Sequence, residues 1–470
     1  FDAGRSVVDA EGRVASTARS SVNVSGGSES TFSHDSIRIS RPKLWSPDSP
    51  YLYSVRTVIR ENGRDIDEVT EPLGFRWFSF DAVEGFFLNG KPLKLRGTNR
   101  HQDLKGYGNA VPDDLHVRDL EIIKETGFNF VRLAHYPQDP SVLAAADRLG
   151  LMLWEEIPVV NLVHLSEEFN KNSESMLREM IRQHRNHPSV ILWGYMNEIF
   201  LRAPKNDAQT TATVELAKRL EKIAREEDPG RLTAIAFDRG GTEDRYHASG
   251  LGQITHVIGW NLYHGWYYET FDDFGKFLDE QHRRFPTRPL FISEYGANAD
   301  RRVHSLKPKR FDSTMEWQRM YHESYLRQIN DRRFVSGSAV WNNFDFSSEF
   351  RGETIPHINQ KGLFTYDRKP KDISYLYKAS FVSSPVLHIA VRDWPVRSGA
   401  SEQRVDIYTN LDEVELFHDG APVGKKSVGP SRKASWDIKL RPGVNSLAAR
   451  GSRGGQLVSD LAEIPWRDPA

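Results

Sequence analysis

Cysteine is absent from all 470 residues of this chain. The protein therefore has no disulfide, no thiolate metal ligand and no cysteine nucleophile, and its redox compartment stays open because either side of a membrane suits such a composition. Apolar runs of the ~20 residues that span a bilayer are absent too. With 63 basic and 64 acidic side chains the formal net charge is -1, so no overall field attracts nucleic acid or an anionic membrane. We expect a neutral or locally recognised partner, and no nucleic acid or membrane.

The hydrophobic pattern changes near residue 85 and again near residue 384. In the first part, the alternating segment Tyr51–Arg60 is followed by the turn Glu61–Arg64, which indicates a β-hairpin. A β pattern returns in the last part, whereas short apolar segments alternate with helical ones between the two changes. We therefore predict an immunoglobulin-like β-sandwich over residues 1–84, a central domain over 85–383 and a second immunoglobulin-like sandwich over 384–470.

The central domain carries eight candidate strands, most of them separated by segments with helical periodicity. This alternation is typical of a TIM barrel, which needs roughly 250 residues. The predicted fold class is a multidomain protein in which a central (β/α)8 TIM barrel is flanked by immunoglobulin-like β-sandwiches. The candidate strands lie around residues 93–99, 128–134, 151–157, 190–197, 232–237, 256–262, 290–295 and 338–344.

Two glutamates end apolar segments of the predicted barrel. Glu198 ends the run that begins at Val190, and Glu294 ends the run that begins at Leu290. The carboxyl ends of barrel strands form the face that carries chemistry. Cleavage of a glycosidic bond needs one carboxyl group to protonate the leaving oxygen and a second to attack the sugar or to activate water. A single glutamate at a strand end is more often a capping or salt-bridge residue, but the surroundings of these two favour a catalytic pair.

The surroundings of both glutamates resemble glycoside hydrolase family 2. That family places its acid/base in an Asn-Glu pair after an apolar strand and its nucleophile in a Ser-Glu-Tyr/Phe-Gly segment, which Asn197-Glu198 and Ser293–Gly296 match. The resemblance spans roughly residues 40–380 and points to the β-galactosidase-like branch. Its further landmarks are Gly97–His101, Val131–Pro137, Trp154–Glu156, Trp260–Tyr263 and Trp341–Phe346.

The resemblance implies a retaining mechanism with Glu294 as nucleophile and Glu198 as acid/base, and no cofactor. Asn197 is expected to hydrogen-bond a sugar hydroxyl beside the reacting carbon. The remaining expected contacts are Arg132 and Tyr263 against the nucleophile, His135 on sugar hydroxyls or the transition state, Trp341 as an aromatic floor, and His101 at the site. For His135, His101 and Trp341 a purely structural role is the alternative.

No metal site is expected. Some galactosidases of the family hold magnesium through a Glu-x-His sequence, but this chain has Glu156-Ile157-Pro158 there. The histidine pair His184 and His187, three residues apart, belongs to a predicted helix end rather than to a zinc site.

Terminal β-D-galactosides, plain or modified, are the first choice of substrate, on the resemblance to the β-galactosidase-like branch. Asn359-Gln360-Lys361-Gly362 stands against this choice, because β-glucuronidases use an Asn-x-Lys-Gly run to clamp a sugar carboxylate. The galactosidase-like branch also shows this run, so it separates the two sugars poorly. A β-glucuronidase or uronidase of the same family is thus the alternative, and a non-catalytic carbohydrate-binding protein on a retained barrel is a third.

Family members begin with a jelly-roll domain, and the resemblance leads us to expect a chain without that domain, either as a fragment or as a shortened enzyme. The expected partner is an oligosaccharide or a polysaccharide-derived substrate, and a homo-oligomer is left open. The location expected is the bacterial periplasm or exterior for a processed or truncated product, and otherwise the cytoplasm.

Overall fold

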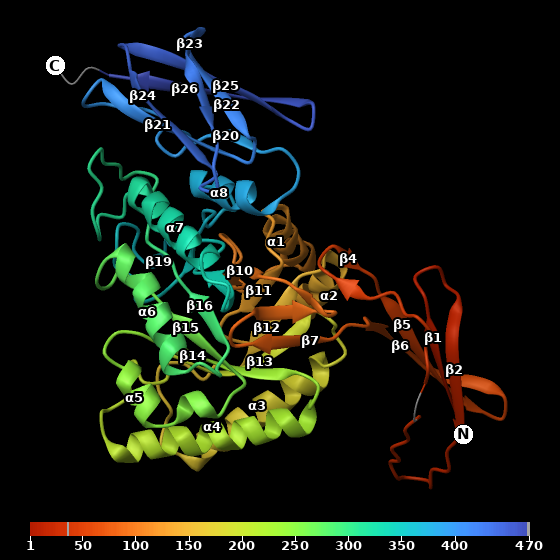
Figure 1. Cartoon of the computed structure of the whole chain (residues 1–470). Coiled ribbons are helices and arrows are strands. Elements are labelled where there is room, and N and C mark those ends of the chain that lie inside the picture. Colours follow the sequence, from red (N-terminus) through yellow and green to blue (C-terminus); the bar gives the residue numbers. More distant parts are fainter. Residues whose placement is uncertain (35–36, 468–470) are drawn as a thin grey trace.

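A computed structural model describes residues 1–34 and 37–467. Figure 1 shows a small β-sheet near the N-terminus, a central barrel wrapped by helices, and a β-sandwich at the C-terminal end. The N-terminal part is a four-stranded antiparallel sheet with the order β2-β1-β5-β6. This single sheet occupies the part of the chain for which the first sandwich was predicted. Its strands are β1 (Asp2–Val8), β2 (Val14–Ser21), β5 (Tyr53–Glu61) and β6 (Arg64–Leu73), beside the short pair β3 (Trp45–Ser46) and β4 (Ser49–Pro50).

The predicted hairpin is present between β5 and β6, where Glu61 pairs with Arg64. Asn62 and Gly63 both have positive φ, 50° and 80°, as the tight turn of such a hairpin requires. A three-stranded sheet of β7 (Phe78–Asp81), β8 (Gly85–Leu88) and β9 (Lys91–Pro92) then leads into the barrel.

The centre of the molecule is a closed barrel of eight parallel strands in chain order, which confirms the predicted TIM barrel (Figure 1). The eighth strand begins and ends earlier than predicted, because Trp341 and Phe346 pack on His135 and His101 beyond its end. The strands are β10 (Leu95–Arg100), β11 (Phe130–Leu133), β12 (Met152–Glu156), β13 (Val190–Asn197), β14 (Leu232–Asp238), β15 (Val257–Asn261), β16 (Leu290–Glu294) and β17 (Val335–Val340).

Helices surround the barrel, and their ends follow capping rules. The helix α2 starts at Pro140, whose fixed φ suits a first turn, after Asp139 accepts a hydrogen bond from the Ser141 backbone N–H. Gly150, whose φ of 70° is left-handed, caps its carboxyl-terminal end after Leu149. The helices are α1 (Asp113–Glu125), α2 (Pro140–Leu149), α3 (Glu167–His184), α4 (Asp207–Glu227), α5 (Glu243–Ala248), α6 (Phe271–Arg284), α7 (Met315–Asn330) and α8 (Asp372–Phe381), with the 3-10 turn η1 (Leu251–Gln253).

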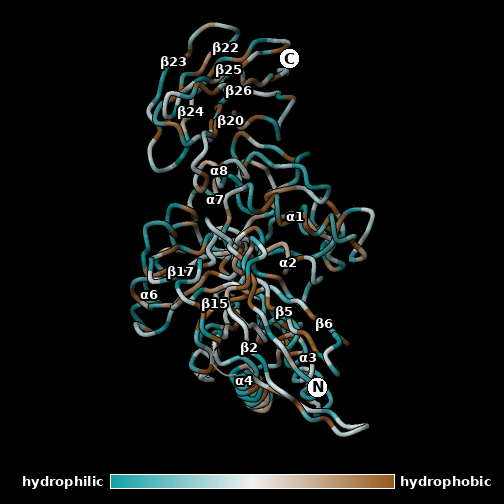
Figure 2. Tube along the Cα trace, turned by 90° about the vertical axis from the view of Figure 1, so that its right-hand side faces the viewer, coloured by the Kyte–Doolittle hydropathy of each residue, from teal (hydrophilic) through white to brown (hydrophobic). Residues whose placement is uncertain are grey.

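The barrel interior is packed rather than hollow. Phe130, Trp154 and Phe291 fill it from three different strands, and all three are fully or almost fully buried. Trp45 closes the amino-terminal end, where its indole N–H donates to the Asp147 carbonyl at 2.9 Å. Figure 2 shows hydrophobic segments gathered at the centre of the barrel. This closed end leaves the opposite end of the strands for chemistry.

The C-terminal part is a two-sheet sandwich. One sheet has the order β20-β21-β24 and the other the order β23-β22-β25-β26, around a core that includes Ile407, Trp436 and Leu447. Its strands are β20 (Leu387–Ile389), β21 (Glu402–Thr409), β22 (Glu413–His418), β23 (Ala421–Ser427), β24 (Lys433–Lys439), β25 (Gly443–Arg453) and β26 (Gln456–Trp466).

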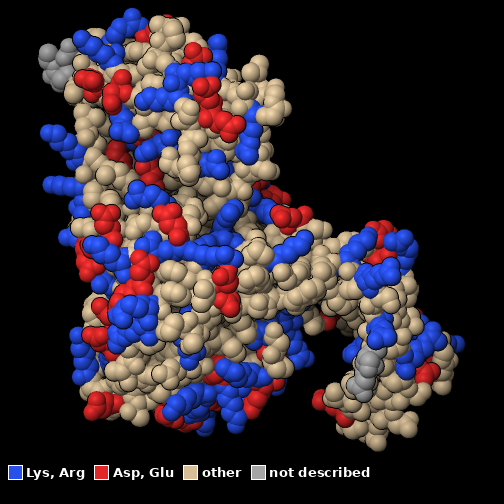
Figure 3. Space-filling model, viewed as in Figure 1, with Lys and Arg blue, Asp and Glu red and all other residues tan. Residues whose placement is uncertain are grey.

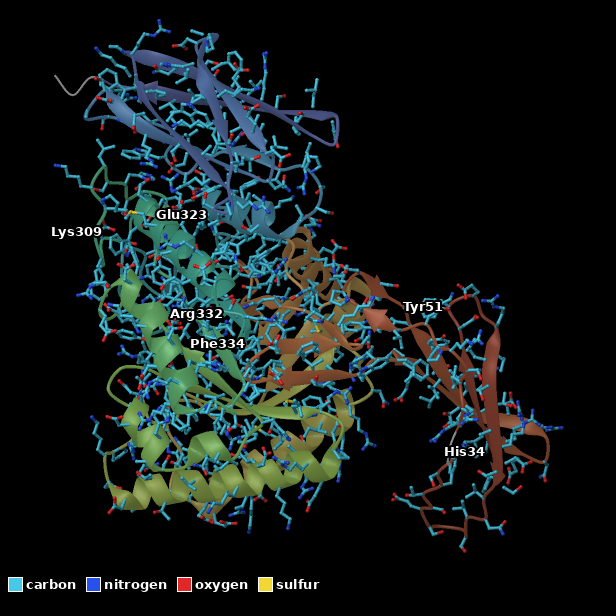
Figure 4. All side chains as sticks on the ribbon, in the orientation of Figure 1. His34, Tyr51, Lys309, Glu323, Arg332 and Phe334 are labelled. Carbon is cyan, nitrogen blue, oxygen red and sulfur yellow. The ribbon has the colours of Figure 1, made fainter. Side chains whose placement is uncertain are left out.

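Helix α7 ties this sandwich to the barrel. Glu323 accepts a hydrogen bond from the Tyr408 hydroxyl at 2.7 Å and pairs with the ammonium of Lys433. Figure 4 shows Glu323 on α7 at the side that faces the sandwich. On its other side α7 carries Tyr321 and Tyr325, whose hydroxyls donate to the backbone carbonyls of Leu262 and His264.

Basic and acidic side chains are interspersed over the face seen in Figure 3, in keeping with the balanced formal charge. Within residues 1–34 and 37–467, no helix is long and apolar enough to cross a membrane.

Candidate active site

Both predicted glutamates stand at the carboxyl-terminal rim of the barrel. Glu294 is the last residue of β16 and is 3% exposed, and Glu198 directly follows β13. Glu198 has a φ of 49°, a left-handed conformation that costs a non-glycine residue energy and is frequent at functional sites. Asn261, at the end of β15, is in register with Glu294 and donates a 3.0 Å hydrogen bond to Oε1 of Glu198. Asn261 thus links the two strand ends, by its side chain to Glu198 and by its backbone register to Glu294.

Glu294 receives a donor on each of its oxygens. Arg132, at 0% exposure, donates from Nη1 to Oε1 at 2.9 Å. The Tyr263 hydroxyl donates to Oε2 at 2.7 Å. Both partners are the ones expected from the sequence. Two donors, one of them a full positive charge, stabilise the ionised carboxylate that an attacking group must be.

Glu198 lies in a different environment. Burial, followed by the negative charges of Glu294 and Asp238, raises the pKa of Glu198 from 4.5 to about 8. Its carboxyl group therefore holds a proton at neutral pH. One carboxyl group with paired donors and one kept protonated are the two states that acid/base-assisted displacement needs.

Asn197 is oriented by two donors. Its Oδ1 accepts from Nη2 of Arg132 at 2.8 Å and from Nδ2 of Asn261 at 3.1 Å. Because the oxygen is occupied, the amide nitrogen of Asn197 is the group left to bind a ligand. An amide donor beside Glu198 is what the sequence predicted there.

His135 and Trp341 form one wall of this rim. Their rings stack with centroids 5.1 Å apart and an interplanar angle of 17°. Nδ1 of His135 lies 2.7 Å from Oε1 of Glu156, and its Nε2 lies 3.7 Å from Oε1 of Glu294. The structure therefore brings both residues to the predicted nucleophile.

His101 packs against Trp341 and Phe346. Its ring stacks on Phe346 at 4.2 Å and meets Trp341 edge-on at 5.3 Å. Its Nδ1 lies 3.2 Å from the Tyr136 hydroxyl. Burial, then the positive charge of neighbouring His135 and arginines, holds the pKa of His101 well below 6.5. A neutral, stacked ring of this kind supports Trp341.

Lys361 is buried beside the same rim, at 0% exposure. Its ammonium donates to the Tyr267 hydroxyl and to Oδ1 of Asn298, each at 2.9 Å. The Tyr267 ring packs edge-on against Tyr263, with ring centroids 5.1 Å apart. Lys361 is thus one aromatic ring away from Tyr263, the hydrogen-bond donor to Glu294. Asn359 braces the loop, since its Oδ1 accepts from the Lys361 backbone N–H at 3.2 Å.

A second cation faces the same phenol. Nη1 of Arg351 lies 3.0 Å from the Tyr267 hydroxyl and 2.9 Å from Oε1 of Glu353. Burial acts to raise the pKa of Tyr267, but the charges of Lys361 and Arg351 outweigh it and lower the pKa. The predicted Asn-x-Lys run is therefore one part of a positively charged corner.

Four residues of the site were not assigned a role from the sequence: Glu156, Asn261, Tyr267 and Arg351. Asn261 lies two residues before Tyr263 in a recognised segment, so its position was a usable signal. Tyr267 and Arg351 lie on loops, where no periodicity indicates direction.

Gly194, inside β13, makes room for part of this site. A Cβ atom at this position would lie 2.7 Å from Cβ of Glu156 and would collide with the indole nitrogen of Trp154. The Trp154 ring carries the Arg132 guanidinium on its face, 4.9 Å from the ring centroid. A glycine is thus required here by close approach rather than by backbone angle.

Outside this rim, the described residues offer two features that could be mistaken for a further site. Residues 1–34 and 37–467 contain no group of three or more His, Asp or Glu side chains arranged to hold a metal ion. His184 and His187 instead contact the carboxylates of Glu155 at 2.9 Å and Asp147 at 2.6 Å. A cavity of about 990 Å³ lies between α7 and the C-terminal sandwich, lined among others by Glu316, Arg319, Trp394 and Arg397, and neither predicted catalytic glutamate reaches it.

Relatives of known sequence include both kinds of glycosidase. A β-glucuronidase of Bacteroides fragilis is 38% identical over 449 residues, covering 92% of this chain and 62% of its own length. The β-galactosidase BoGH2A of Bacteroides ovatus is 30% identical over 524 residues, covering 97% and 58%. Among solved structures, a Bacteroides uniformis β-glucuronidase has a TM-score of 0.96 at 42% identity, covering 99% of this chain and 57% of the other. The chain thus spans about six-tenths of the length of these relatives, 57% to 62%.

Family descriptions match nearly all of the chain. The glycosyl hydrolases family 2 description matches residues 3–76, its TIM barrel domain matches residues 82–384, and a domain of unknown function matches residues 401–459. The barrel match alone covers more than half of the chain and includes both glutamates. This chain belongs to glycoside hydrolase family 2.

Proposed function

We propose that this chain is the catalytic part of a retaining exo-β-glycosidase that hydrolyses terminal β-D-glucuronides. Glu294 attacks the anomeric carbon while Glu198 gives its proton to the leaving oxygen, and a glycosyl ester forms on Glu294. Glu198, now ionised, then takes a proton from water, which attacks the same carbon and releases the sugar with its configuration retained.

The observation that carries the choice of sugar is the partner set of Lys361. Its ammonium is fully buried and, within the described residues, contacts a phenol and an amide rather than a carboxylate. Glu353, which pairs with Arg351 at 2.9 Å, acts on this ammonium only from a distance. A buried cation with no carboxylate in direct contact is costly. The C6 carboxylate of a glucuronide would supply that counter-charge, with Arg351 as a second cation near the same phenol. The neutral C6 hydroxyl of a galactoside would leave Lys361 unpaired.

The similarity to known proteins also favours a glucuronide over a galactoside as the substrate. Sequence motifs alone favoured β-galactosides, with glucuronides as the alternative. The B. fragilis relative and the B. uniformis structure, both β-glucuronidases, are more similar to this chain than BoGH2A is. A further structure of similar fold is a B. uniformis β-glucuronidase covalently bound to cyclophellitol-6-carboxylate aziridine, at 42% identity and a TM-score of 0.96. For these reasons the glucuronide takes first place.

The test is nitrophenol release from matched aryl β-glycosides of glucuronic acid, galactose, glucose and mannose. We expect kcat/KM to be highest for the glucuronide and turnover to vanish in Glu294→Gln. A preference for the galactoside would overturn the choice of sugar but keep the reaction. Absence of turnover for all four, in a folded protein, would count against the reaction itself.

A further inference from the structure

A third carboxylate lies in the site and takes no part in the two-glutamate scheme. Glu156, the last residue of β12, is 1% exposed. Arg132 grips it with the paired side of its guanidinium, from Nε to Oε2 at 3.0 Å and from Nη2 to Oε1 at 2.9 Å. Burial acts to raise the pKa of Glu156, but the charges of Arg132 and His135 outweigh it and lower the pKa. Glu156 is therefore a buried anion.

Arg132 is shared between two anions. While Glu156 holds Nε and Nη2, the remaining Nη1 donates to Glu294 at 2.9 Å. Bidentate pairing fixes the plane of a guanidinium, so Glu156 determines where Nη1 points. The guanidinium also lies on the face of Trp154 and is fully buried. Its charge thus cannot be screened by water.

The charge on Glu294 changes during the reaction. When an oxygen of Glu294 bonds to the anomeric carbon, the bond to the leaving oxygen breaks and Glu198 passes its proton to that oxygen. Glu294 is then a neutral ester, and Arg132 has lost one of its two anionic partners. An unpaired buried cation is strongly unfavourable.

We propose that Glu156 is a positioning residue that stabilises the glycosyl-enzyme, because it keeps Arg132 neutralised after Glu294 has become an ester. This inference rests on the proposed function, but it does not depend on which sugar is cleaved. Glu156 also accepts the Nδ1 hydrogen of His135 at 2.7 Å, which turns Nε2 of that ring toward Glu294 and the sugar. One carboxylate therefore orients two residues that contact the reacting groups.

The variant Glu156→Gln keeps the shape of the side chain and removes its charge. Wild type and variant are each mixed with an activated 2-fluoro-β-glucuronosyl fluoride and, separately, with its galactosyl counterpart. Intact-protein mass spectrometry then measures the rate of covalent labelling of Glu294, and the rate at which water removes the label. We expect the ratio of labelling rate to removal rate to fall by about tenfold or more in the variant, as one lost charge partner implies.

Two further variants separate charge from structure. Glu156→Asp retains the negative charge and is expected to keep the ratio near that of the wild type even where both rates fall. Glu155→Gln removes a neighbouring buried carboxylate, paired with His184 at 2.9 Å, and should leave the ratio unchanged.

A wild-type ratio in Glu156→Gln overturns the inference, and so does an equal loss of ratio in Glu156→Asp. Labelling by the galactosyl donor alone would refute the glucuronide assignment while the Glu156 comparison proceeds with that donor. Labelling by neither donor would refute the proposed function, and the inference with it.

Discussion

The hydroxyl of Tyr263 donates a 2.7 Å hydrogen bond to Oε2 of Glu294. Arg132 occupies the other oxygen, so the carboxylate is held from two sides and cannot rotate without losing a partner. Tyr263 itself is placed by α7, whose tyrosines bind the backbone of the loop that carries it. The geometry of this pair makes each partner separately testable.

Removing the Tyr263 hydroxyl should slow the reaction without unfolding the chain. We expect kcat/KM of Tyr263→Phe to fall by about 10- to 100-fold, because a hydrogen bond to a charged group contributes about 1.5–3 kcal/mol. Steady-state kinetics measure this. Tyr51→Phe is the matched control, since its hydroxyl contacts Glu11 on the distant N-terminal sheet (Figure 4). Equal effects in both variants would contradict a role at Glu294.

Activity should decline on the alkaline side as Glu198 loses its proton. With a pKa of about 8, the acid form that serves the leaving oxygen disappears as the pH rises through that value. A pH profile of kcat/KM should show this limb. In Glu198→Gln the limb should vanish, and substrates with poor leaving groups should lose far more rate than dinitrophenyl ones.

The same carboxyl group should make the protein less stable at high pH. The pKa of Glu198 is higher in the folded state, about 8, than its ordinary 4.5, so its contribution is fully present below pH 4.5 and is lost as the pH rises through 8. Glu198→Gln avoids this loss, with an upper limit of roughly 5 kcal/mol. Thermal unfolding should show the Tm advantage of the variant growing from pH 5 to pH 9. An advantage that shrinks with pH would contradict the burial of this acid.

Charge at residue 361 should decide between sugars. We expect Lys361→Met to lose kcat/KM for the aryl glucuronide by about 10- to 100-fold, because a charge-assisted bond to the carboxylate disappears. Turnover of the galactoside should stay level or improve. Lys309→Met, at an exposed loop position, is the control (Figure 4). A parallel loss for both sugars would show that Lys361 only supports the loop.

The closed end of the barrel should depend on Trp45. Trp45→Ala removes a fully buried ring and leaves the Asp147 carbonyl without its indole donor, which should reduce the free energy of unfolding by about 3–5 kcal/mol. Denaturant unfolding measures the change. Trp77→Ala, at a 56% exposed position, should cost less than about 1 kcal/mol. Similar costs for both would mean that Trp45 does not seal the barrel.

The barrel was predictable from the sequence because its strands are buried on both faces. The run Val190–Met196 carries no charged side chain, and the strand is buried throughout, so both its position and its ends could be located. The eighth strand was misplaced since Trp341 continues the apolar run but packs against His135 at the mouth. An apolar residue buried inside a strand and one buried at the site cannot be told apart from the sequence alone.

The site was predictable where a residue ends a strand. Arg132, Asn197 and Glu294 all lie on strand residues of the barrel and meet where the sequence placed them. Tyr267 and Arg351 lie on loops, and only the folded chain shows that both approach Lys361. The sequence drew attention to Glu156 only because the Glu-x-His metal sequence is absent there. The structure shows instead that Glu156 accepts hydrogen bonds from the guanidinium of Arg132.

Gly194 shows how much of this site is set by an empty volume. The space that a methyl group would fill at this position is taken by Trp154 and Glu156, the two side chains that hold Arg132 from its face and from its edge. A survey that changes only ligand-contacting residues would pass over it. Even a methyl group at residue 194 would displace Trp154 or Glu156, and with them the guanidinium that pairs with Glu294. The absence of a side chain at Gly194 is therefore one of the requirements for the charge arrangement of the site.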